Sequence, residues 1–330
     1  MTASQTRRPV IAVLTTGGTI AALGHDRLDL TRYGETNTSV AAEDLVGSVP
    51  ELTAVADVRV RAVLDRPSHD LSFDDLVTLA QRVDRESRDD HVTGVVVTHG
   101  TNTLEETAYF LELTRTGATP VVVTGAMRPA SALSADGPAN LLNAVRLAAA
   151  PAARGCGVLV TLNDLVHAAR DVTKAASSGV GAFASPRLGP AGRISPTGNV
   201  ELGSVTVGRS IAAAGRLGPV PRVEIVTSCV GADGALVEAA VTAGAAGIVV
   251  AATGGGFMPE RQEAALRRAA DAGVMVLVTT RTGSGPVTRT ADGVLINVSD
   301  LQPWKARILL AVALAAGWSI EQVAAYADLA

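Results

Sequence analysis

The amino-acid sequence predicts an α/β fold, with a large N-terminal doubly wound parallel-type sheet domain and a smaller C-terminal α/β domain. Short, unbroken β-branched runs such as Val95–Val97 are typical of parallel strands that are buried on both faces. These runs alternate with amphipathic helices, which is the βαβ pattern of a doubly wound sheet. A stretch rich in Gly and Pro, residues 180 to 220, separates two such series.

The N-terminal domain is expected to span residues 1–185. Its run Val95–Val97 stops at Gly100, before Thr103 and Glu106 form a Thr-x-x-Glu capping box that opens a helix. The segment Gly24–Val40 is polar and carries turn formers, so it is expected to form a mobile surface loop. Such loops near a strand end often act as lids. The expected strands are Val10–Leu14, Val58–Leu64, Val95–Val97, Pro120–Thr124 and Gly157–Leu162, and the expected helices are 73–85, Leu104–Arg115 and Pro138–Ala149.

Residues 186–220 are expected to form hairpins and then a linker, and residues 221–330 the C-terminal domain. The same alternation of apolar runs and helical patterns continues there, interrupted by the turn Gly254–Gly256. The expected strands are Arg222–Thr227, Gly247–Ala251 and Val274–Thr279, and the expected helices are Gly234–Ala243, Glu260–Ala272, 303–316 and 319–327.

The composition excludes several classes of partner. The chain has 330 residues, of which 47% are hydrophobic, and this is enough to bury a sizeable core. Its formal charge is −4, and no cluster of Lys and Arg is interleaved with aromatic residues. Nucleic acids and anionic membrane surfaces are therefore poor partners, and a small neutral or zwitterionic ligand fits better.

The apolar segments read as core elements. Arg7 and Arg8 precede the apolar residues 9–23, but the glycine turn inside this stretch favours a strand over a secretory or twin-arginine signal. The run Ile308–Trp318 is too short to span a bilayer. The two cysteines, Cys156 and Cys229, adjoin apolar strand-like runs and are expected to be buried free thiols. We therefore expect a cytoplasmic protein.

Polar side chains follow the first and third expected strands. The turn Thr15–Thr19 contains a Gly pair, which lets the backbone approach a ligand, and the hydroxyls of Thr16 and Thr19 could act as a nucleophile or as donors. A simple turn is the alternative, and the spacing argues against a phosphate cradle. Thr101 and Asn102 lie where open α/β sheets place their chemistry, at the carboxyl end of a strand.

Three further residues carry chemistry that such a site could use. Tyr33 is the only aromatic residue in the expected loop and could carry a proton for a threonine nucleophile. His69 lies in a polar cluster after the second strand, where a surface turn residue is the alternative. Of the 28 residues that are Lys or Arg, only Lys174 and Lys305 are lysines. A desolvated lysine can act as a base and arginine cannot, although codon bias is another explanation for so few lysines.

Taken together, these motifs resemble the bacterial-type L-asparaginase and glutaminase family, and the match runs along most of the chain. Several specific motifs occur in the right order, which makes chance similarity very unlikely. The stretches that carry the resemblance are Thr15–Ala21, His99–Thr107, Thr124–Pro129, Ser134–Pro138, Asn163–Asp164, Arg170–Lys174 and Pro303–Arg307.

The resemblance implies a mechanism and an assembly. Thr16 would be the nucleophile that forms an acyl-enzyme on a side-chain amide, and Tyr33 would assist it from the lid. Thr101 and Lys174 would form a second hydroxyl–lysine pair, and Ser68 would hold the substrate carboxylate. The resemblance also implies a homodimer or homotetramer, in which the neighbouring subunit completes the site, and neither metal nor cofactor.

Three positions depart from the family pattern. This chain has Asn102 where the family has Asp, His69 where many members have Gln, and Phe257 where the C-terminal turn usually offers Asn or His. All three belong to the end that binds the α-amino and α-carboxylate groups. Exchanging the acid for an amide removes a charge-assisted bond of roughly 1.5–3 kcal/mol to an α-ammonium.

The leading hypothesis is therefore an amidohydrolase whose recognition is shifted away from free L-asparagine. Its substrate would be an N-acylated or peptidyl asparagine, a succinamate-like amide or a cyclic imide. The alternatives are an ordinary L-asparaginase that tolerates Asn102, and an inactive homologue that binds a small amide as a sensor.

Overall fold

The computed structural model describes residues 8–36, 38–205, 207–290 and 292–329. The chain divides into two compact units, one up to Val207 and the other from Gly208. Each unit is an α/β domain with its own sheet, so the predicted fold class is confirmed.

Within the described residues, the first unit is built on an eight-stranded sheet with the order β10-β9-β6-β5-β4-β3-β1-β2. Strands β1 to β5 pair in parallel, whereas β6, β9 and β10 pair antiparallel. Asn163 and Asp164, with φ of 50° and 63°, join β5 to β6 in a tight turn of the kind that antiparallel hairpins require. The strands are β1 (Val10–Thr15), β2 (Asp57–Ala62), β3 (Gly94–Thr98), β4 (Val121–Thr124), β5 (Val158–Leu162), β6 (Leu165–Ala168), β9 (Gly192–Ile194) and β10 (Val200–Leu202).

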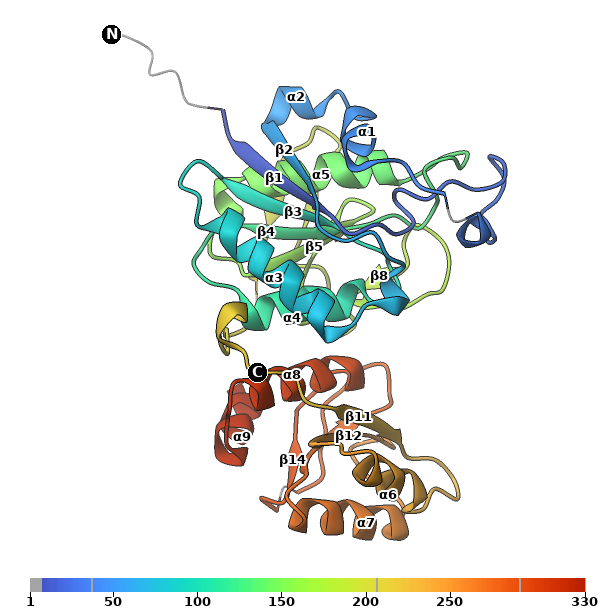
Figure 1. Ribbon diagram of the computed structural model, residues 1–330, viewed down its shortest axis with the longest axis vertical. Helices are drawn as coiled ribbons and strands as arrows, with labels where there is room; N and C mark the ends of the chain where they lie inside the picture. The colour runs from blue at the N-terminus through green and yellow to red at the C-terminus, as the bar shows by residue number, and fades with distance from the viewer. Residues whose placement is uncertain (1–7, 37, 206, 291, 330) are drawn as a thin grey trace. The chain divides into compact units, whose positions relative to one another are not determined.

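Helices cover both faces of this sheet. Helices α1, α2 and α5 lie on one face, and α3 and α4 lie on the other (Figure 1). Outside the sheet, β7 (Thr173–Lys174) and β8 (Phe183–Ala184) form a two-stranded ribbon. The helices are α1 (Ala42–Gly47), α2 (Leu52–Val55), α3 (Phe73–Ser87), α4 (Leu104–Thr114) and α5 (Gly137–Ala149), with the short 3-10 helices η1 (Tyr33–Glu35), η2 (Ser68–Asp70) and η3 (Pro151–Ala153).

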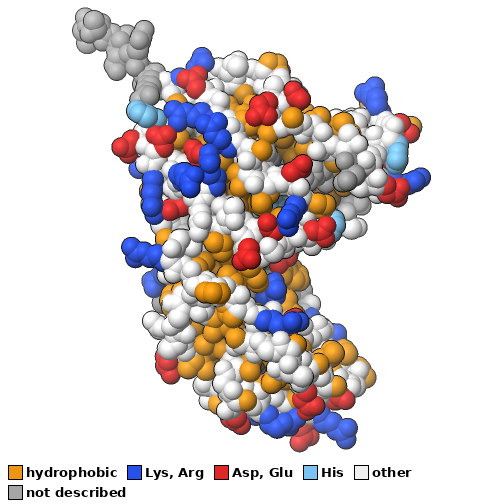
Figure 2. Space-filling model, viewed as in Figure 1, with side chains coloured by type: hydrophobic (Ala, Val, Ile, Leu, Met, Phe, Trp, Pro, Cys, Tyr) orange, Lys and Arg blue, Asp and Glu red, His pale blue; other side chains and the backbone are white. Residues whose placement is uncertain are grey.

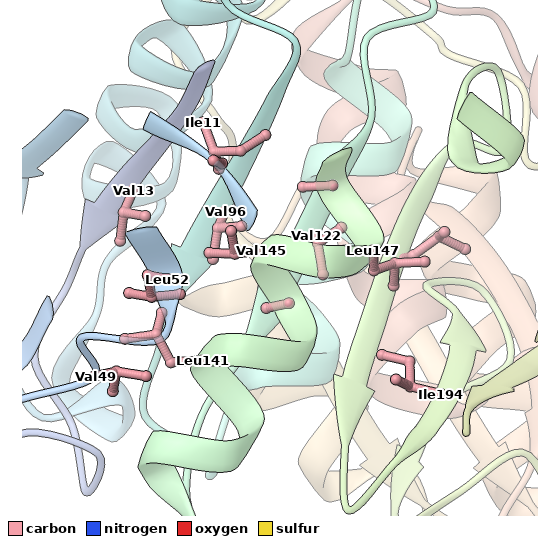
Figure 3. Close-up of a cluster of buried hydrophobic side chains, with 14 of the residues drawn as sticks. Ile11, Val13, Val49, Leu52, Val96, Val122, Leu141, Val145, Leu147 and Ile194 are labelled. Atoms are coloured by element: carbon pink, nitrogen blue, oxygen red, sulfur yellow. The ribbon is translucent and has the colours of Figure 1, made fainter. Parts of the chain in front are cut away.

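The core under α5 shows why the β-branched runs form the sheet. Ile11, Val13, Val96 and Val122 come from three neighbouring strands and meet the apolar side chains of α5 (Figure 3). All four are fully buried. This packing anchors the middle of the sheet, so the loops at the carboxyl ends of β1 and β3 start from rigid positions.

The second unit contains a parallel sheet with the order β11-β12-β13-β14. Helix α8 packs on one face, and α6 and α7 lie on the other (Figure 1). The elements are β11 (Val223–Thr227), α6 (Ala235–Thr242), β12 (Gly247–Ala252), α7 (Glu260–Asp271), β13 (Met275–Thr280), β14 (Leu295–Asn297), α8 (Pro303–Ala315) and α9 (Ile320–Leu329), after the 3-10 helix η4 (Ala214–Arg216).

Several expectations need correction. The capping box at Thr103 does not form, because the Thr103 hydroxyl donates to the Ser68 carbonyl oxygen at 2.7 Å instead. Cys156 and Cys229 are free thiols, but Cys229 is exposed and Cys156 only partly buried. The first unit continues past residue 185, because the β9–β10 hairpin hydrogen-bonds to β6 and is part of the large sheet.

The segments considered as membrane signals lie in the fold as follows. Arg7 falls outside the described residues, and the apolar residues after it form the buried strand β1. The run Ile308–Trp318 lies largely in α8. Among the helices of the described ranges, none has both the length and the apolar character needed to cross a bilayer. On the face shown in Figure 2, acidic and basic side chains are interspersed.

Candidate active site

The turns after β1 and β3 pack directly against each other. Strands β1 and β3 are adjacent, and Thr15 pairs with Thr98 at their carboxyl ends. Gly17 and Gly18 have φ of 84° and 92°, which side-chain-bearing residues rarely adopt. A Cβ at Gly18 would lie 2.4 Å from the Gly100 Cα atom. Gly18 therefore allows the close backbone approach that brings the two polar turns together.

A cavity of about 290 Å³, here called the reaction cavity, opens beside these turns. It is formed by the first two turns, the loop that carries Tyr33, and the segment around η2 after β2. Its lining residues are Gly18, Thr19, Ala22, Tyr33, Gly34, Thr38, Ser39, Asp65, Arg66, Pro67, Ser68, His69, Gly100 and Thr101.

Thr101 and Lys174 form a hydrogen-bonded pair at this cavity. The Lys174 ammonium donates to Thr101 Oγ1 at 2.9 Å and to Asn102 Oδ1 at 3.0 Å. The Lys174 backbone N–H donates to Glu105 Oε1 at 3.0 Å, which ties the β7 strand to the start of α4. Burial lowers the pKa of Lys174, and the nearby Glu105 carboxylate opposes part of this shift. The expected contact between Lys174 and Thr101 is thus present.

A second hydroxyl pair lies on the same cavity. Thr19 Oγ1 and the Tyr33 phenol are 3.1 Å apart. The loop that carries Tyr33 is fixed to the first turn, because Leu23 N–H donates to Thr38 O at 2.9 Å and Val40 N–H to Ala21 O at 2.8 Å. Tyr33 therefore lines the cavity, and its hydroxyl partner there is Thr19.

Thr16, the nucleophile that the resemblance implied, is placed differently. Its Oγ1 donates to the Thr98 carbonyl oxygen at 3.0 Å, and its side chain is 1% exposed. Thr16 does not line the reaction cavity, whereas Thr19 does. The sequence offered both hydroxyls beside the Gly pair, and only the direction of the turn distinguishes them.

Four residues were expected to bind the α-amino and α-carboxylate groups of a substrate. Three of them belong to the first unit, and Phe257 belongs to the second. Ser68 is buried at the cavity, and His69 is exposed at its rim. Asn102 Nδ2 lies 3.4 Å from His69 Nδ1, so Asn102 bridges this histidine and Lys174. Phe257 belongs to the second unit, where it follows the turn after β12 and is 63% exposed.

Three residues at or beside the cavity were not predicted to belong to the site: His99, Asp65 and Arg66. His99 is fully buried, with Nδ1 2.7 Å from the Gly100 carbonyl oxygen and Nε2 2.9 Å from Thr107 Oγ1. Burial lowers the pKa of His99 to about 4, so the ring is neutral and locks the turn that carries Thr101. Asp65 and Arg66 line the cavity after β2, where the sequence shows only a polar strand end.

This arrangement defines a class of protein. It is a two-unit α/β protein with a Thr–Tyr pair and a Thr–Lys pair at one cavity, which lies at the carboxyl edge of its larger sheet. Such a site suits acyl transfer through a hydroxyl. Among the described residues, no group of three or more His, Cys, Asp and Glu is arranged to hold a metal ion.

Comparisons with known proteins agree with this class. Residues 10–206 match the family model of the asparaginase N-terminal domain, and residues 222–326 match that of the glutaminase/asparaginase C-terminal domain. The chain is 39% identical to L-asparaginase 2 of Bacillus subtilis over 323 residues, covering 96% of this chain and 86% of that one. It is 37% identical to the glutaminase-asparaginase of Pseudomonas aeruginosa over 324 residues, covering 94% of this chain and 88% of that one.

The fold is also shared with a solved structure. The crystal structure of a probable cytoplasmic L-asparaginase from Campylobacter jejuni superposes with a TM-score of 0.91 at 34% identity, covering 97% of this chain and 99% of that chain. The chain belongs to the asparaginase and glutaminase family of amidohydrolases, which act on C–N bonds in amides.

Proposed function

We propose that the chain hydrolyses a side-chain or cyclic amide through an acyl-enzyme on Thr19. The observation that carries this proposal is the 3.1 Å contact between Thr19 Oγ1 and the Tyr33 phenol on the reaction cavity. Thr19 Oγ1 attacks the amide carbon while the phenol takes its proton and passes its own to the leaving nitrogen. The C–N bond then breaks, and a primary amide releases ammonia.

The Thr101–Lys174 pair serves the second half of the reaction. Thr101 lines the same cavity and holds the Lys174 amine at 2.9 Å. A lysine whose pKa is lowered can be neutral, and it then accepts the proton of Thr101 as Thr101 takes one from the attacking water. The water oxygen bonds to the acyl carbon and the ester bond to Thr19 breaks, while the proton held by the Lys174–Thr101 pair returns to Thr19 Oγ1 and the acid product leaves.

Recognition is shifted away from free L-asparagine. Asn102 is neutral and spans Lys174 and His69, so this part of the site offers no carboxylate from Asn102 to an α-ammonium. We propose an N-acylated or peptidyl asparagine, a succinamate-like amide or a cyclic imide as substrate. Ser68 is proposed to hold the substrate carboxylate, with His69 and Asn102 as further binding residues.

A panel of amides tests this proposal. Ammonia release, or acid release from a cyclic imide, is measured for free L-asparagine, L-glutamine, an N-acetylated asparagine, succinamate and succinimide. We expect the highest kcat/KM for a compound without an α-ammonium. Highest activity on L-asparagine supports the second candidate, an ordinary L-asparaginase, which the names of the Bacillus subtilis and Pseudomonas aeruginosa relatives favour. A melting shift without any turnover supports the inactive sensor.

We propose a homodimer or homotetramer that works in the cytoplasm. The family resemblance supports the assembly, and the name of the Campylobacter jejuni protein supports the compartment. Light scattering on the purified full chain measures the assembly, and a monomeric mass at micromolar concentration contradicts it. Fractionation of cells that express the chain measures the compartment.

A further inference from the structure

A second cavity lies on the other side of the turn after β1. Its volume is about 390 Å³, and its lining includes Thr15 and Thr98 from the ends of β1 and β3, and Glu43 from α1. Among the residues at its wall are also Gly17, Ser39 and Asp65. Hydroxyl or carboxylate oxygens come from Thr15, Ser39, Glu43, Asp65 and Thr98, and the rest of the lining is Gly17 and apolar side chains. The function proposed above assigns this cavity no task.

The two cavities share a wall. Ser39 and Asp65 line both of them. The Asp65 carboxylate lies against the turn, since a Cβ on Gly17 would be 3.2 Å from Asp65 Oδ1. Asp65 therefore offers a carboxylate at the wall that the reaction cavity and the second cavity share.

One buried hydroxyl in the second cavity lacks a partner. Thr98 is 0% exposed, and within the described residues its Oγ1 makes no hydrogen bond. Its neighbours at the carboxyl edge differ, because Thr16 Oγ1 donates to Thr98 O and Thr124 Oγ1 donates to Thr161 O. A buried hydroxyl without a partner is costly, so a small polar guest in this cavity is favoured.

We propose that the second cavity binds ammonium. An ammonium ion donates four hydrogen bonds, which suits a lining of hydroxyl oxygens at Thr15, Ser39 and Thr98 and of carboxylates at Glu43 and Asp65. The inference rests on the proposed amide hydrolysis, which releases ammonia in the adjoining cavity. Protonated by water, that product passes the Asp65 carboxylate and occupies the second cavity, where it acts as a product inhibitor.

The test measures ammonium binding without turnover. Thermal unfolding of the full chain is followed in ammonium chloride and in equal concentrations of potassium chloride, because potassium has a similar size but donates no hydrogen bond. We expect stabilisation that is specific to ammonium. In Thr98→Val the apparent affinity should fall about tenfold, as expected for losing a bond to a charged donor. In Glu43→Gln, where the carboxylate is exposed, it should fall about two- to fivefold.

Glu51→Gln is the matched control, because Glu51 is an exposed glutamate that lines neither cavity, and it should keep the full response. Equal effects of potassium and ammonium on the wild type overturn the proposal. It is also overturned if Thr98→Val becomes more stable while its ammonium response is unchanged. Should Thr98→Val fail to fold, the comparison of Glu43→Gln with Glu51→Gln takes its place. An equal ammonium-specific stabilisation in these two variants then overturns the proposal.

A kinetic measurement separates this inference from the proposed function. Inhibition of amide hydrolysis by added ammonium chloride should weaken by the same factors in Thr98→Val and Glu43→Gln. If no amide is hydrolysed but the ammonium-specific stabilisation persists, the proposed function is wrong and the cavity assignment is supported. If amides are hydrolysed and ammonium neither stabilises nor inhibits, the cavity assignment is wrong and the proposed function stands.

Discussion

The two hydroxyl pairs on the reaction cavity differ in how the fold holds them. Thr19 meets Tyr33, which comes from a loop and is only partly buried. Thr101 meets Lys174, which is held from both ends, by its ammonium and by the backbone bond to Glu105. The second pair contains Lys174, whose pKa burial lowers. Thr19–Tyr33, which depends on a loop, suits the attack that follows substrate entry. Thr101–Lys174, which is fixed and contains a titratable amine, suits proton transfer from the attacking water.

The largest expected effect tests which hydroxyl begins the reaction. Thr19→Val keeps the side-chain shape and should lower kcat by about 10³-fold or more, because it removes the nucleophile. The matched control is Thr16→Val, which removes the buried bond to Thr98 O and should cost about 1 kcal/mol of stability with little change in kcat. Near wild-type turnover in Thr19→Val together with loss in Thr16→Val would restore Thr16 as the nucleophile.

The second pair is tested by Lys174→Met, which keeps much of the apolar stem. Loss of the base should lower kcat by about 10²- to 10³-fold, with a smaller change in KM. Lys174→Arg should not rescue the rate, because arginine keeps its proton. If Lys174→Arg restores most of kcat, the lysine contributes only its positive charge, and the contrast between the two pairs disappears. Rates from single-turnover experiments measure the effect.

His99 fixes the turn of the second pair, so it should link that pair to acid stability. Its pKa is lowered from 6.5 to about 4, and the unfolded chain therefore binds more protons between these values. Stability from this group is complete above pH 6.5 and is lost as the pH falls towards 4, by up to roughly 3 kcal/mol. Denaturant unfolding from pH 7 to pH 4 measures the slope, and His99→Gln should flatten it. An unchanged slope in this variant shows that other groups control acid unfolding.

Much of the fold was predictable, because β-branched runs indicate buried parallel strands and a 3.6-residue period of apolar residues indicates the helices between them. The strand β14 was missed because Leu295–Asn297 is only three residues long. A hairpin within residues 186–220 was expected, but not that it belongs to the first unit, where the hydrogen bonds of β9 to β6 make it part of the large sheet.

The site was predictable as a set of turns but less so as a set of contacts. The family resemblance implied that Thr101 and Lys174 form a pair. In the structure Lys174 Nζ lies 2.9 Å from Thr101 Oγ1. The resemblance implied Thr16 as the nucleophile, whereas Thr19 lines the cavity, because a turn with two positive-φ glycines decides which side chain faces it. Asp65 escaped notice because only the packing of its loop against Gly17 places it at a cavity.

The smallest expected effect concerns Asn102, which touches the second pair without belonging to it. Asn102→Asp places a carboxylate about 3 Å from the Lys174 nitrogen, where Asn102 Oδ1 now lies at 3.0 Å. An anion there favours the ammonium form and should raise the pKa of Lys174, so the rise of kcat with pH should move to higher pH. The same carboxylate gives an α-ammonium its partner. We therefore expect kcat/KM to rise about tenfold for free L-asparagine and to fall for an N-acylated asparagine. Both substrates are assayed across pH in both proteins, because a change in Lys174 alone moves both profiles in parallel, whereas recognition of the amino group moves them in opposite directions. An unchanged value for L-asparagine, or an equal rise for both substrates, means that recognition is not set at Asn102.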